Sequence, residues 1–453
     1  MYNIKVKDIL EATQGKLLGG DIETVIGDVC INSREIKEND LFVPIIGENV
    51  DAHRFINDAL KVGAATLTSN PDEEVKTDKA YILVEDTIKA LQSIGIMCRK
   101  RLDIPIIGVT GSVGKTTTRE MIKTALSGTM NVYETEKNFN SQIGVPIVLS
   151  RIDEDKEIAV LEMGMSEPGQ MENLSRIVQP DICVVTVIGV AHIEFLKTKE
   201  NIRKEKLAIT SHMNKDGVLF INGDDEMLLE IKNQIGVKTF CYGTNDACEY
   251  KAENIRVVGY NTVYDYVHED KKITVTLNSM GKHNVLNSLA GMAIADYLGK
   301  DLEATANTFK SFSGMRLKFI DVPGKYTIID DTYNASPDSM KASINVLSDM
   351  EVKGRRIAVL GDMKELGENS EQYHREIGEY VASKADMVVT VGELAKYIAD
   401  SAKIINTNIS CYSFDDIGEA TLFLLNELKA DDVVLLKASN SMKFNTIVEH
   451  INL

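Results

Sequence analysis

Proline is scarce in this sequence, with 8 prolines among 453 residues, and low-complexity tracts are absent. Hydrophobic residues make up 44% of the chain and charged residues 26%, which favours a folded protein over a disordered one. No run of about 18 apolar residues is present, and the first residues lack the apolar core of a signal peptide. We therefore expect an ordered, cytoplasmic protein without membrane insertion.

Positive charge is also in short supply. The chain has 50 Lys and Arg residues against 68 Asp and Glu residues, so its net charge is −18. This balance repels nucleic acid and anionic membranes unless a local basic patch intervenes, and no such patch is visible. We expect no nucleic-acid partner. An anionic small molecule can still bind, because helix N-termini and a few placed cations act locally.

Paired cysteines are missing as well. None of the six cysteines forms a C-x-x-C pair, the spacing typical of structural zinc sites and of dithiol redox centres. We therefore interpret them as reduced thiols of a cytosolic protein. They are Cys30, Cys98, Cys183, Cys241, Cys248 and Cys411.

The length predicts about three domains, since compact domains usually contain roughly 100–200 residues. We place them at residues 1–100, 101–312 and 313–453, with a run rich in β-branched residues over 255–277 and a polar linker over 311–314. The first is expected to be a small α/β domain. Alternating strands and helices in the other two predict a central doubly wound P-loop domain and a C-terminal Rossmann-like domain. The main expected strands are 104–110, 158–163, 182–188, 218–221, 326–329, 356–360, 387–391 and 433–436.

A phosphate-binding loop is expected at Gly108-Val-Thr-Gly-Ser-Val-Gly-Lys-Thr116, between a strand and a helix. Glycines there let backbone N–H groups approach phosphate oxygens, while Lys115 reaches the β- and γ-phosphates and the Thr116 hydroxyl binds Mg²⁺. Val109 occupies the place of the first glycine in the strict motif. A plain strand-to-helix turn would explain the glycines but not the Lys-Thr pair. The residues expected to bind the nucleotide here are Gly111, Ser112, Gly114, Lys115, Thr116 and Thr117.

Two further polar residues follow expected strands of the same sheet. Glu162 ends one strand, and His192 follows the next. Ligands collect at the carboxyl edge of parallel sheets, so a carboxylate at this edge can share Mg²⁺ with Thr116. A solvated Glu and an ordinary loop His are the alternatives. We predict that Lys115, Glu162 and His192 act in catalysis, and that Glu162 and His192 bind metal.

These residues, in this order, resemble the Mur ligases of peptidoglycan assembly, and the resemblance covers nearly the whole chain. The motifs that carry it are Asn32-Ser-Arg34, Asp40-Leu-Phe-Val-Pro44, Asn138-Phe-Asn-Ser-Gln-Ile-Gly-Val-Pro146, Glu162-Met-Gly-Met-Ser166, Ala191-His-Ile-Glu194, Gly281-Lys-His-Asn284 with Asn287, Ile329-Asp-Asp-Thr-Tyr-Asn-Ala-Ser-Pro337 and Leu360-Gly-Asp-Met-Lys-Glu-Leu-Gly367.

The resemblance implies an ATP- and Mg²⁺-dependent ligase that forms an amide bond through an acyl phosphate. Asn-Ala-x-Pro and Gly-Asp-Met-x-Glu-Leu-Gly favour the members that join D-alanyl-D-alanine to UDP-MurNAc-tripeptide, so these two small molecules are the expected substrates. Closure of the C-terminal domain about residues 311–316 is expected to assemble the site and to exclude water. We expect a monomer.

The resemblance also implies individual roles. Asn284 would lie near adenine, Arg316 on the phosphates and Asp331 on the ribose. Lys206 would be carbamylated by CO₂ and would help to hold a second Mg²⁺ beside His192; as an unmodified lysine it would be one of the ordinary solvated residues of a Lys-rich helix. The remaining residues implied to bind substrate are Ser33, Arg34, Asn138, Asn140 and Asn334, with Ser33 and Arg34 on the UDP.

Two positions depart from the family pattern and leave alternatives open. Ser141 stands where a second Asn is usual, and Asn440 stands where the family typically has Arg. A guanidinium is a natural partner for a carboxylate, so a paralogue with another amino acceptor is one alternative. Others are the sibling that adds the third residue, a folylpolyglutamate synthetase-like enzyme, and a P-loop module that binds ATP without ligation.

Overall fold

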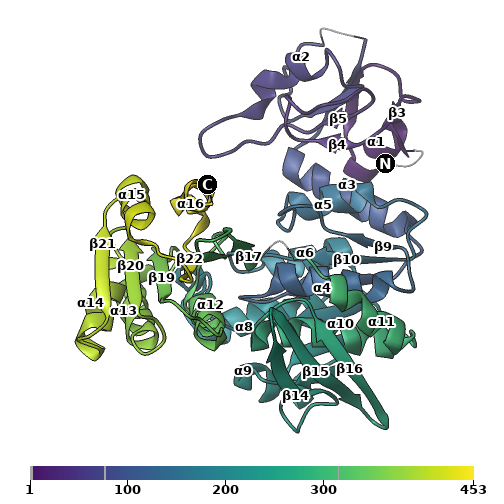
Figure 1. Ribbon diagram of the computed structural model, residues 1–453. Coiled ribbons are helices and arrows are strands. Elements are labelled where there is room, and N and C mark those ends of the chain that lie inside the picture. Colours follow the sequence, from purple (N-terminus) through teal and green to yellow (C-terminus); the bar gives the residue numbers. More distant parts are fainter. Residues whose placement is uncertain (1–3, 76–77, 315, 453) are drawn as a thin grey trace.

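Each of three domains is built on one large β-sheet, as the computed structural model in Figure 1 shows. The structure describes residues 4–75, 78–314 and 316–452. The N-terminal sheet lies at the top of the view, the central sheet below it and the C-terminal sheet at the left. No helix among these described residues is long and apolar enough to cross a membrane.

The N-terminal domain is built on a five-stranded sheet of order β2-β7-β6-β5-β4, in which all neighbours are parallel except β2 and β7. A two-stranded antiparallel ribbon, β1 with β3, lies beside it. The elements are β1 (Ile4–Lys5), α1 (Val6–Thr13), β2 (Lys16–Gly19), β3 (Val25–Ile26), β4 (Val29–Cys30), β5 (Leu41–Phe42), a 3₁₀ turn (Ala52–Phe55), α2 (Ile56–Ala59), β6 (Ala65–Thr68) and β7 (Ala80–Leu83).

Helix α3 (Thr87–Arg101) joins this domain to the next one, because it packs against α1 on one side and against α5 and α6 on the other. Gly95 permits the approach to α5, since a Cβ at Gly95 would lie 2.9 Å from the Pro146 Cα. Arg99 donates to the carbonyls of Val178 and Gln179 and pairs with Asp181 at 3.1 Å. The N-terminal domain is thereby fixed to the central domain.

The central sheet has the order β16-β15-β14-β13-β12-β11-β8-β10-β9. Neighbours from β9 to β14 are parallel, and β14, β15 and β16 are antiparallel. The strands are β8 (Ile106–Thr110), β9 (Val132–Glu134), β10 (Ile158–Glu162), β11 (Ile182–Val185), β12 (Val218–Asn222), β13 (Lys238–Gly243), β14 (Tyr250–Val258), β15 (Asn261–His268) and β16 (Lys271–Leu277).

Helices cover both faces of this sheet, and a separate apolar cluster fills each side. Helices α4 and α10 pack together on one face, while α5 and α6 lie in the cluster of the other. The helices are α4 (Lys115–Ser127), α5 (Gly144–Arg151), α6 (Gln170–Val178), α7 (Ile193–Leu196), α8 (Lys199–Leu207), α9 (Glu226–Leu229), α10 (Lys282–Tyr297) and α11 (Leu302–Thr308), with 3₁₀ turns at Ala208–Thr210, Lys232–Gln234 and Phe309–Ser311.

The C-terminal sheet has the order β17-β18-β22-β19-β20-β21, and only β17 runs antiparallel to its neighbour. Apolar clusters again lie on both faces. The elements are β17 (Lys318–Asp321), β18 (Thr327–Asp330), α12 (Pro337–Asp349), β19 (Arg356–Gly361), a 3₁₀ turn (Gly367–Asn369), α13 (Ser370–Val381), β20 (Met387–Val391), α14 (Lys396–Ile405), β21 (Ser410–Phe414), α15 (Ile417–Glu427), β22 (Val433–Lys437), a 3₁₀ turn (Asn440–Met442) and α16 (Asn445–Ile451).

The structure confirms the predicted class of three α/β domains, with a doubly wound central sheet and a Rossmann-like C-terminal sheet. The β-branched run over 255–277 forms antiparallel strands that extend the central sheet. Helix α8 ends at Leu207 and continues only as a 3₁₀ turn over Ala208–Thr210. The β-branched Ile209 and Thr210 in that turn favour the helix less than straight side chains do.

Candidate functional site

A cavity of about 1090 Å³ opens where the carboxyl edge of the central sheet faces the C-terminal domain. Its lining combines the loop after β8, the end of β10 and the loop after β11 with residues that follow β18, β19 and β22 of the C-terminal sheet. Two domains therefore contribute to one site, as the carboxyl-edge rule for parallel sheets predicts.

The loop between β8 and α4 forms a backbone cradle at the start of the helix. Gly111 has φ +154° and Gly114 has φ +86°. A Cβ at Gly111 would lie 1.8 Å from the Thr186 hydroxyl oxygen, so no side chain fits there. That hydroxyl donates to the Val113 carbonyl at 2.5 Å and holds the loop against the next strand. Backbone N–H groups at such a helix start bind anions.

Lys115, the first residue of α4, turns back over this loop. Its Nζ donates to the Gly111 carbonyl at 2.9 Å. Burial lowers the pKa of Lys115, the carboxylate of Glu162 opposes that shift, and the cation Arg316 adds to it. The ammonium thus occupies the position from which it can move onto a phosphate once one is present.

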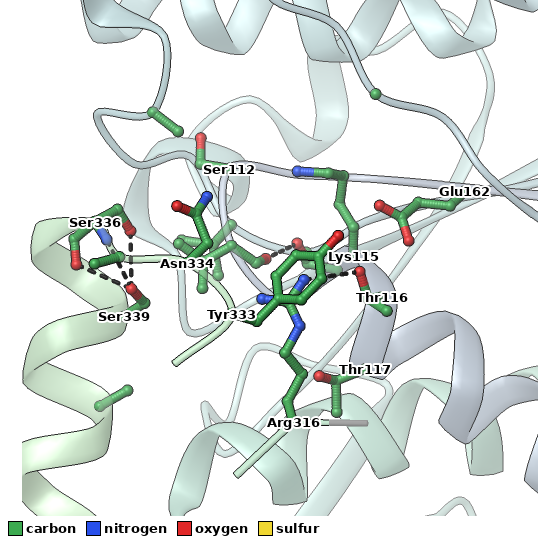
Figure 2. A pocket seen from close by; sticks show the side chains of 18 of the residues that line it. Ser112, Lys115, Thr116, Thr117, Glu162, Arg316, Tyr333, Asn334, Ser336 and Ser339 are labelled. Atoms are coloured by element: carbon green, nitrogen blue, oxygen red, sulfur yellow. Dashed lines mark hydrogen bonds between the residues drawn. The ribbon is translucent and has the colours of Figure 1, made fainter. Parts of the chain in front are cut away.

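Thr116 connects the two domains. Arg316 Nη2 donates to the Thr116 hydroxyl at 3.3 Å, and the Arg316 guanidinium stacks 3.7 Å from the centre of the Tyr333 ring. Figure 2 shows Arg316 and Tyr333 beside Lys115 and Thr116, with Asn334 nearby. The C-terminal domain therefore places a cation directly at the phosphate cradle.

Glu162 ends β10 and lines the cavity, although it is only 3% exposed. One carboxylate oxygen accepts from Asn140 Nδ2 at 2.7 Å, and the other lies 3.7 Å from Nη1 of the buried Arg119. These contacts fix the carboxylate, as expected for a group that holds a metal-bound water or a metal.

His192 lies at the start of α7 with φ +64°, at the boundary with the C-terminal domain. Its Nδ1 is 2.9 Å from the Glu365 carboxylate, and this contact lowers the pKa of Glu365. Thr116 with Arg316 and His192 with Glu365 are therefore two polar contacts that join the domains at the cavity.

Lys206, on α8, lies outside the cavity lining and is 1% exposed. Burial drives the pKa of its ammonium well below the ordinary value, and the nearby charge of Lys115 lowers it further. Among the described residues, no carboxylate lies within ion-pairing distance of its amino group. The charge of the neighbouring Glu205 opposes this lowering of the Lys206 pKa.

Asp331 directly follows β18, and Lys437 is the last residue of the neighbouring β22. The Lys437 ammonium pairs with the Asp331 carboxylate and also donates to the Asn334 carbonyl at 3.0 Å. The Ser343 hydroxyl donates to the same carboxylate. This buried pair orients Asp331 at the cavity wall.

The start of α10 completes the nucleotide side. Asn284 donates to the Ser279 hydroxyl at 2.8 Å and to the Met280 carbonyl at 2.9 Å. Asn287 accepts from Thr118 on α4, which ties the two helices together beside the cradle. Burial lowers the pKa of His283, also in the lining, to about 4, so this imidazole is neutral.

The cavity brings most of the predicted site residues together. Two predicted residues of the central domain are not part of the lining: Gly111, in the cradle between β8 and α4, and Lys206, on α8. Ser33 and Arg34 lie in the N-terminal domain between β4 and β5, away from the lining. The predicted residues in the lining are Ser112, Gly114, Lys115, Thr116, Thr117, Asn138, Asn140, Glu162, His192, Asn284, Arg316, Asp331 and Asn334.

The sequence alone predicts no role for five residues at or beside the cavity, which are Lys437, Tyr333, Arg119, Glu365 and His283. Lys437 could have been found from its position at a strand end next to Asp331, once the order of the strands was known. Tyr333 and Arg119 carry no comparable signal, because stacking on Arg316 and burial behind Glu162 are purely tertiary contacts.

No cluster of three or more His, Cys, Asp or Glu side chains within the described ranges is arranged to hold a metal ion. Mg²⁺ needs no such cage when phosphate oxygens and water supply most of its ligands. Thr116 and Glu162 at the cradle suit that mode of binding, since both place oxygen atoms at the cavity.

Comparison with known proteins gives matches over nearly the whole chain. Residues 109–295 match the Mur ligase middle domain, and residues 315–440 match the Mur ligase glutamate ligase domain. The UDP-N-acetylmuramoyl-tripeptide--D-alanyl-D-alanine ligase of Bacillus subtilis (strain 168) is 36% identical, with 100% of this chain and 99% of the relative covered. The same-named ligase of Escherichia coli (strain K12) is 30% identical over 89% of each chain.

Solved structures agree with these matches. MurF from Acinetobacter baumannii superposes with a TM-score of 0.90 at 28% identity and covers 99% of this chain and 98% of its own. MurF ligase from Thermotoga maritima in complex with ADP superposes with a TM-score of 0.83 at 30% identity, over 95% and 97% of the two chains.

Proposed function

Because this chain belongs to the Mur ligase family, we propose that it is the ATP-dependent ligase that joins D-alanyl-D-alanine to UDP-MurNAc-tripeptide in peptidoglycan precursor synthesis. One structural observation carries the proposal beyond family membership: Arg316 of the C-terminal domain reaches Thr116 of the phosphate cradle. A second domain that completes the nucleotide site suits a reaction in which another substrate must be brought to the γ-phosphate.

In the first step, the terminal carboxylate of the tripeptide attacks the γ-phosphorus of ATP, and ADP leaves. An acyl phosphate is the product. The reaction requires positioning and charge neutralisation more than a reactive side chain. Lys115 and Arg316 supply the two cations at the cradle, and backbone N–H groups of the loop hold the phosphates.

Mg²⁺ is part of the proposal, and Thr116 and Glu162 are the residues that would hold it. When bound, it would supply charge neutralisation between the two anions that must approach each other. Asn140 holds Glu162 by the bond described above, so the carboxylate is already oriented. Asn284 would contact adenine and Asp331 the ribose.

In the second step, the amine of D-alanyl-D-alanine attacks the acyl carbon. The tetrahedral intermediate then collapses, inorganic phosphate leaves, the amide bond remains and the amine loses its proton. We propose that closure about residues 311–316, a range in which residue 315 lies outside the described residues, protects the acyl phosphate from water. A small-angle scattering profile that stays unchanged on adding an ATP analogue with the UDP-peptide would contradict this closure.

A carbamylated Lys206 is the third element of the proposal. A neutral buried amine can add to CO₂, and the carbamate is an oxygen-donating anion that suits Mg²⁺ next to His192. The depressed pKa of Lys206 supports this chemistry. Incubation with ¹³C-labelled bicarbonate should give a carbamate carbon signal in NMR spectra that is absent from Lys206→Met.

The division of labour along the chain follows from the substrates. We propose that residues 1–100 bind the UDP part through Ser33 and Arg34, that residues 101–312 bind ATP, and that residues 313–453 bind the amino acceptor. Asn138, Asn140 and Asn334 would contact the peptide substrates. We also propose that the enzyme is cytoplasmic, since all three substrates are soluble small molecules, and that it is a monomer.

The deciding experiment is a coupled assay of ADP release with each substrate omitted in turn. Product should require ATP, UDP-MurNAc-tripeptide and D-alanyl-D-alanine together, and the amide should be detected by mass spectrometry. Lys115→Ala should lower kcat by a factor on the order of 10² to 10³, the scale seen when a transition-state charge partner is removed. Lys123→Ala, on the exposed side of the same helix, is the matched control.

Two outcomes would overturn the proposal. ATP hydrolysis without dependence on the peptides would favour a nucleotide-binding module, and product only with a different amine would favour a paralogue with another acceptor.

A further inference from the structure

The acceptor of the proposed reaction carries a carboxylate, which must be matched by positive charge in a protein of net charge −18. The cavity therefore has to provide a cation for it. Among the described residues, the lysines and arginines that line the cavity are Lys115, Lys137, Arg316, Lys364 and Lys437.

Three of these cations are already engaged. Lys115 and Arg316 lie at the phosphate cradle, where they contact Gly111 and Thr116. Lys437 is 2% exposed and is held between the Asp331 carboxylate and the Asn334 carbonyl. A second carboxylate at Lys437 would compete with the first.

The remaining two lie on opposite walls. Lys137 follows β9 in the central domain, one residue before Asn138, and its carbonyl accepts from Arg119 at 3.5 Å. Lys364 follows β19 in the C-terminal domain, which brings the acceptor in the proposed mechanism. Position alone thus favours Lys364 for the acceptor and Lys137 for the peptide of the nucleotide substrate.

Lys364 belongs to a rigid polar wall. The Ser439 backbone N–H donates to the Asp362 carbonyl at 3.1 Å, and the Lys364 backbone N–H donates to the Ser439 hydroxyl at 3.0 Å. These bonds join the loop after β19 to the loop after β22. Ser439, Asn440 and Ser441 of the second loop line the cavity beside Lys364.

The Lys364 side chain is oriented by one hydrogen bond and keeps hydrogen-bond donors for a ligand. Its Nζ donates to Asp362 Oδ2 at 3.0 Å, while 49% of the side chain stays exposed. Asp362 Oδ1 accepts from the backbone N–H groups of Leu394 and Ala395 at the start of α14, so part of its charge is already balanced. An ammonium has three donors, and a carboxylate partner occupies only some of them.

We propose that Lys364 binds the terminal carboxylate of the incoming dipeptide and so determines specificity for an acceptor with a free C-terminal acid. The inference rests on the proposed ligase function. It also accounts for Asn440, whose amide donates to the Tyr333 carbonyl at 3.1 Å: the positive charge on this wall comes from residue 364, and residue 440 braces the neighbouring loop.

The test compares D-alanyl-D-alanine with its C-terminal amide as acceptors for the wild type and for Lys364→Met. We expect Lys364→Met to raise KM for the dipeptide at least tenfold. The same variant should leave KM for the amide, for ATP and for the UDP-peptide within twofold of the wild type. Lys364→Arg should recover most of the lost affinity, because it keeps the charge.

Lys353→Met is the matched control, since Lys353 lies in an exposed turn before β19. Thermal unfolding of each variant checks that folding is intact. An unchanged KM for the dipeptide in Lys364→Met overturns the inference, and so does an equal rise in KM for dipeptide and amide. The inference is also wrong if Lys137→Met, but not Lys364→Met, raises KM for the dipeptide.

Failure of the proposed function looks different. In that case the wild type forms no amide with either acceptor, whereas failure of this inference alone leaves wild-type ligation intact.

Discussion

The central and C-terminal domains each bury a lysine, Lys206 outside the cavity lining and Lys437 within it, and the two lysines have different surroundings. Lys437 is 2% exposed and faces Asp331, whereas Lys206 is 1% exposed and has no carboxylate within ion-pairing distance among the described residues. Burial lowers the pKa of both ammonium groups. Asp331 opposes the shift at Lys437 by its charge and by a hydrogen bond, whereas Glu205 opposes the shift at Lys206 by its charge alone. The same side chain therefore has a carboxylate ion-pair partner in one domain and, among the described residues, lacks one in the other.

Lys437→Met gives the largest effect on stability in this comparison. Removing one partner of a buried ion pair leaves the other charge uncompensated, so we expect the free energy of unfolding to fall by about 3–5 kcal/mol. Urea unfolding followed by circular dichroism measures this loss. The double variant Asp331→Asn with Lys437→Met should recover most of it; if the double variant is as unstable as the single one, the pair is not the cause.

Lys206→Met should change stability in the opposite direction. A lysine whose pKa is depressed by burial destabilises the folded state at neutral pH, and methionine removes that penalty. One pKa unit corresponds to about 1.4 kcal/mol, so we expect a gain of about 1 kcal/mol or more. Urea unfolding in CO₂-free buffer without Mg²⁺ measures it, and ligase activity should be lost in the same variant. A destabilised Lys206→Met protein would contradict the contrast between the two lysines.

The gain from Lys206→Met should also depend on pH. The folded-state pKa of Lys206 lies below the unfolded value of about 10.4, so between these two values the unfolded chain binds the additional proton. The stability of the wild type therefore rises with pH relative to Lys206→Met. We expect the difference between the two proteins to shrink as the pH approaches 10, and a difference that is constant from pH 7 to pH 10 would rule out this explanation.

The exposed contact between His192 and Glu365 provides the smallest effect. The Glu365 side chain is 56% exposed, so solvent screens the pair. We expect Glu365→Gln to raise the KM values for substrates about two- to fivefold by weakening domain closure, which corresponds to less than about 1 kcal/mol. Steady-state kinetics measure the change. Glu368→Gln, in the 3₁₀ turn that follows, is a suitable control. A rise in KM larger than tenfold would show that Glu365 does more than hold the domains together.

Residues that are contiguous in the sequence were predicted well. The cradle from Gly111 to Thr117 is a local structure, because its glycines, its lysine and the helix start lie within seven residues. The alternation of strands and helices likewise predicted both parallel sheets. Glu162 and His192 could be placed at the cavity because the carboxyl ends of parallel strands share one edge.

Contacts that depend on strand order or on packing could not be predicted from the sequence. Asp331 and Lys437 are 106 positions apart, and only the neighbouring positions of β18 and β22 bring them together. Helix α3 was missed because its buried face includes Gln92, Gly95 and Arg99, which weaken an amphipathic pattern. Its burial between two domains is a property of the assembled fold.

The packing of α3 between the first two domains also has a consequence for the length of the peptide substrate. Gly95 lies against Pro146 and Arg99 bonds to the end of α6, so these contacts hold the N-terminal domain against the central domain that carries the phosphate cradle. In the proposed binding mode, a nucleotide held by Ser33 and Arg34 would have to extend its peptide as far as the cradle to present its acid there. An extended residue spans roughly 3.3–3.6 Å, so a precursor one amino acid too short would stop that far from the γ-phosphorus and remain unactivated.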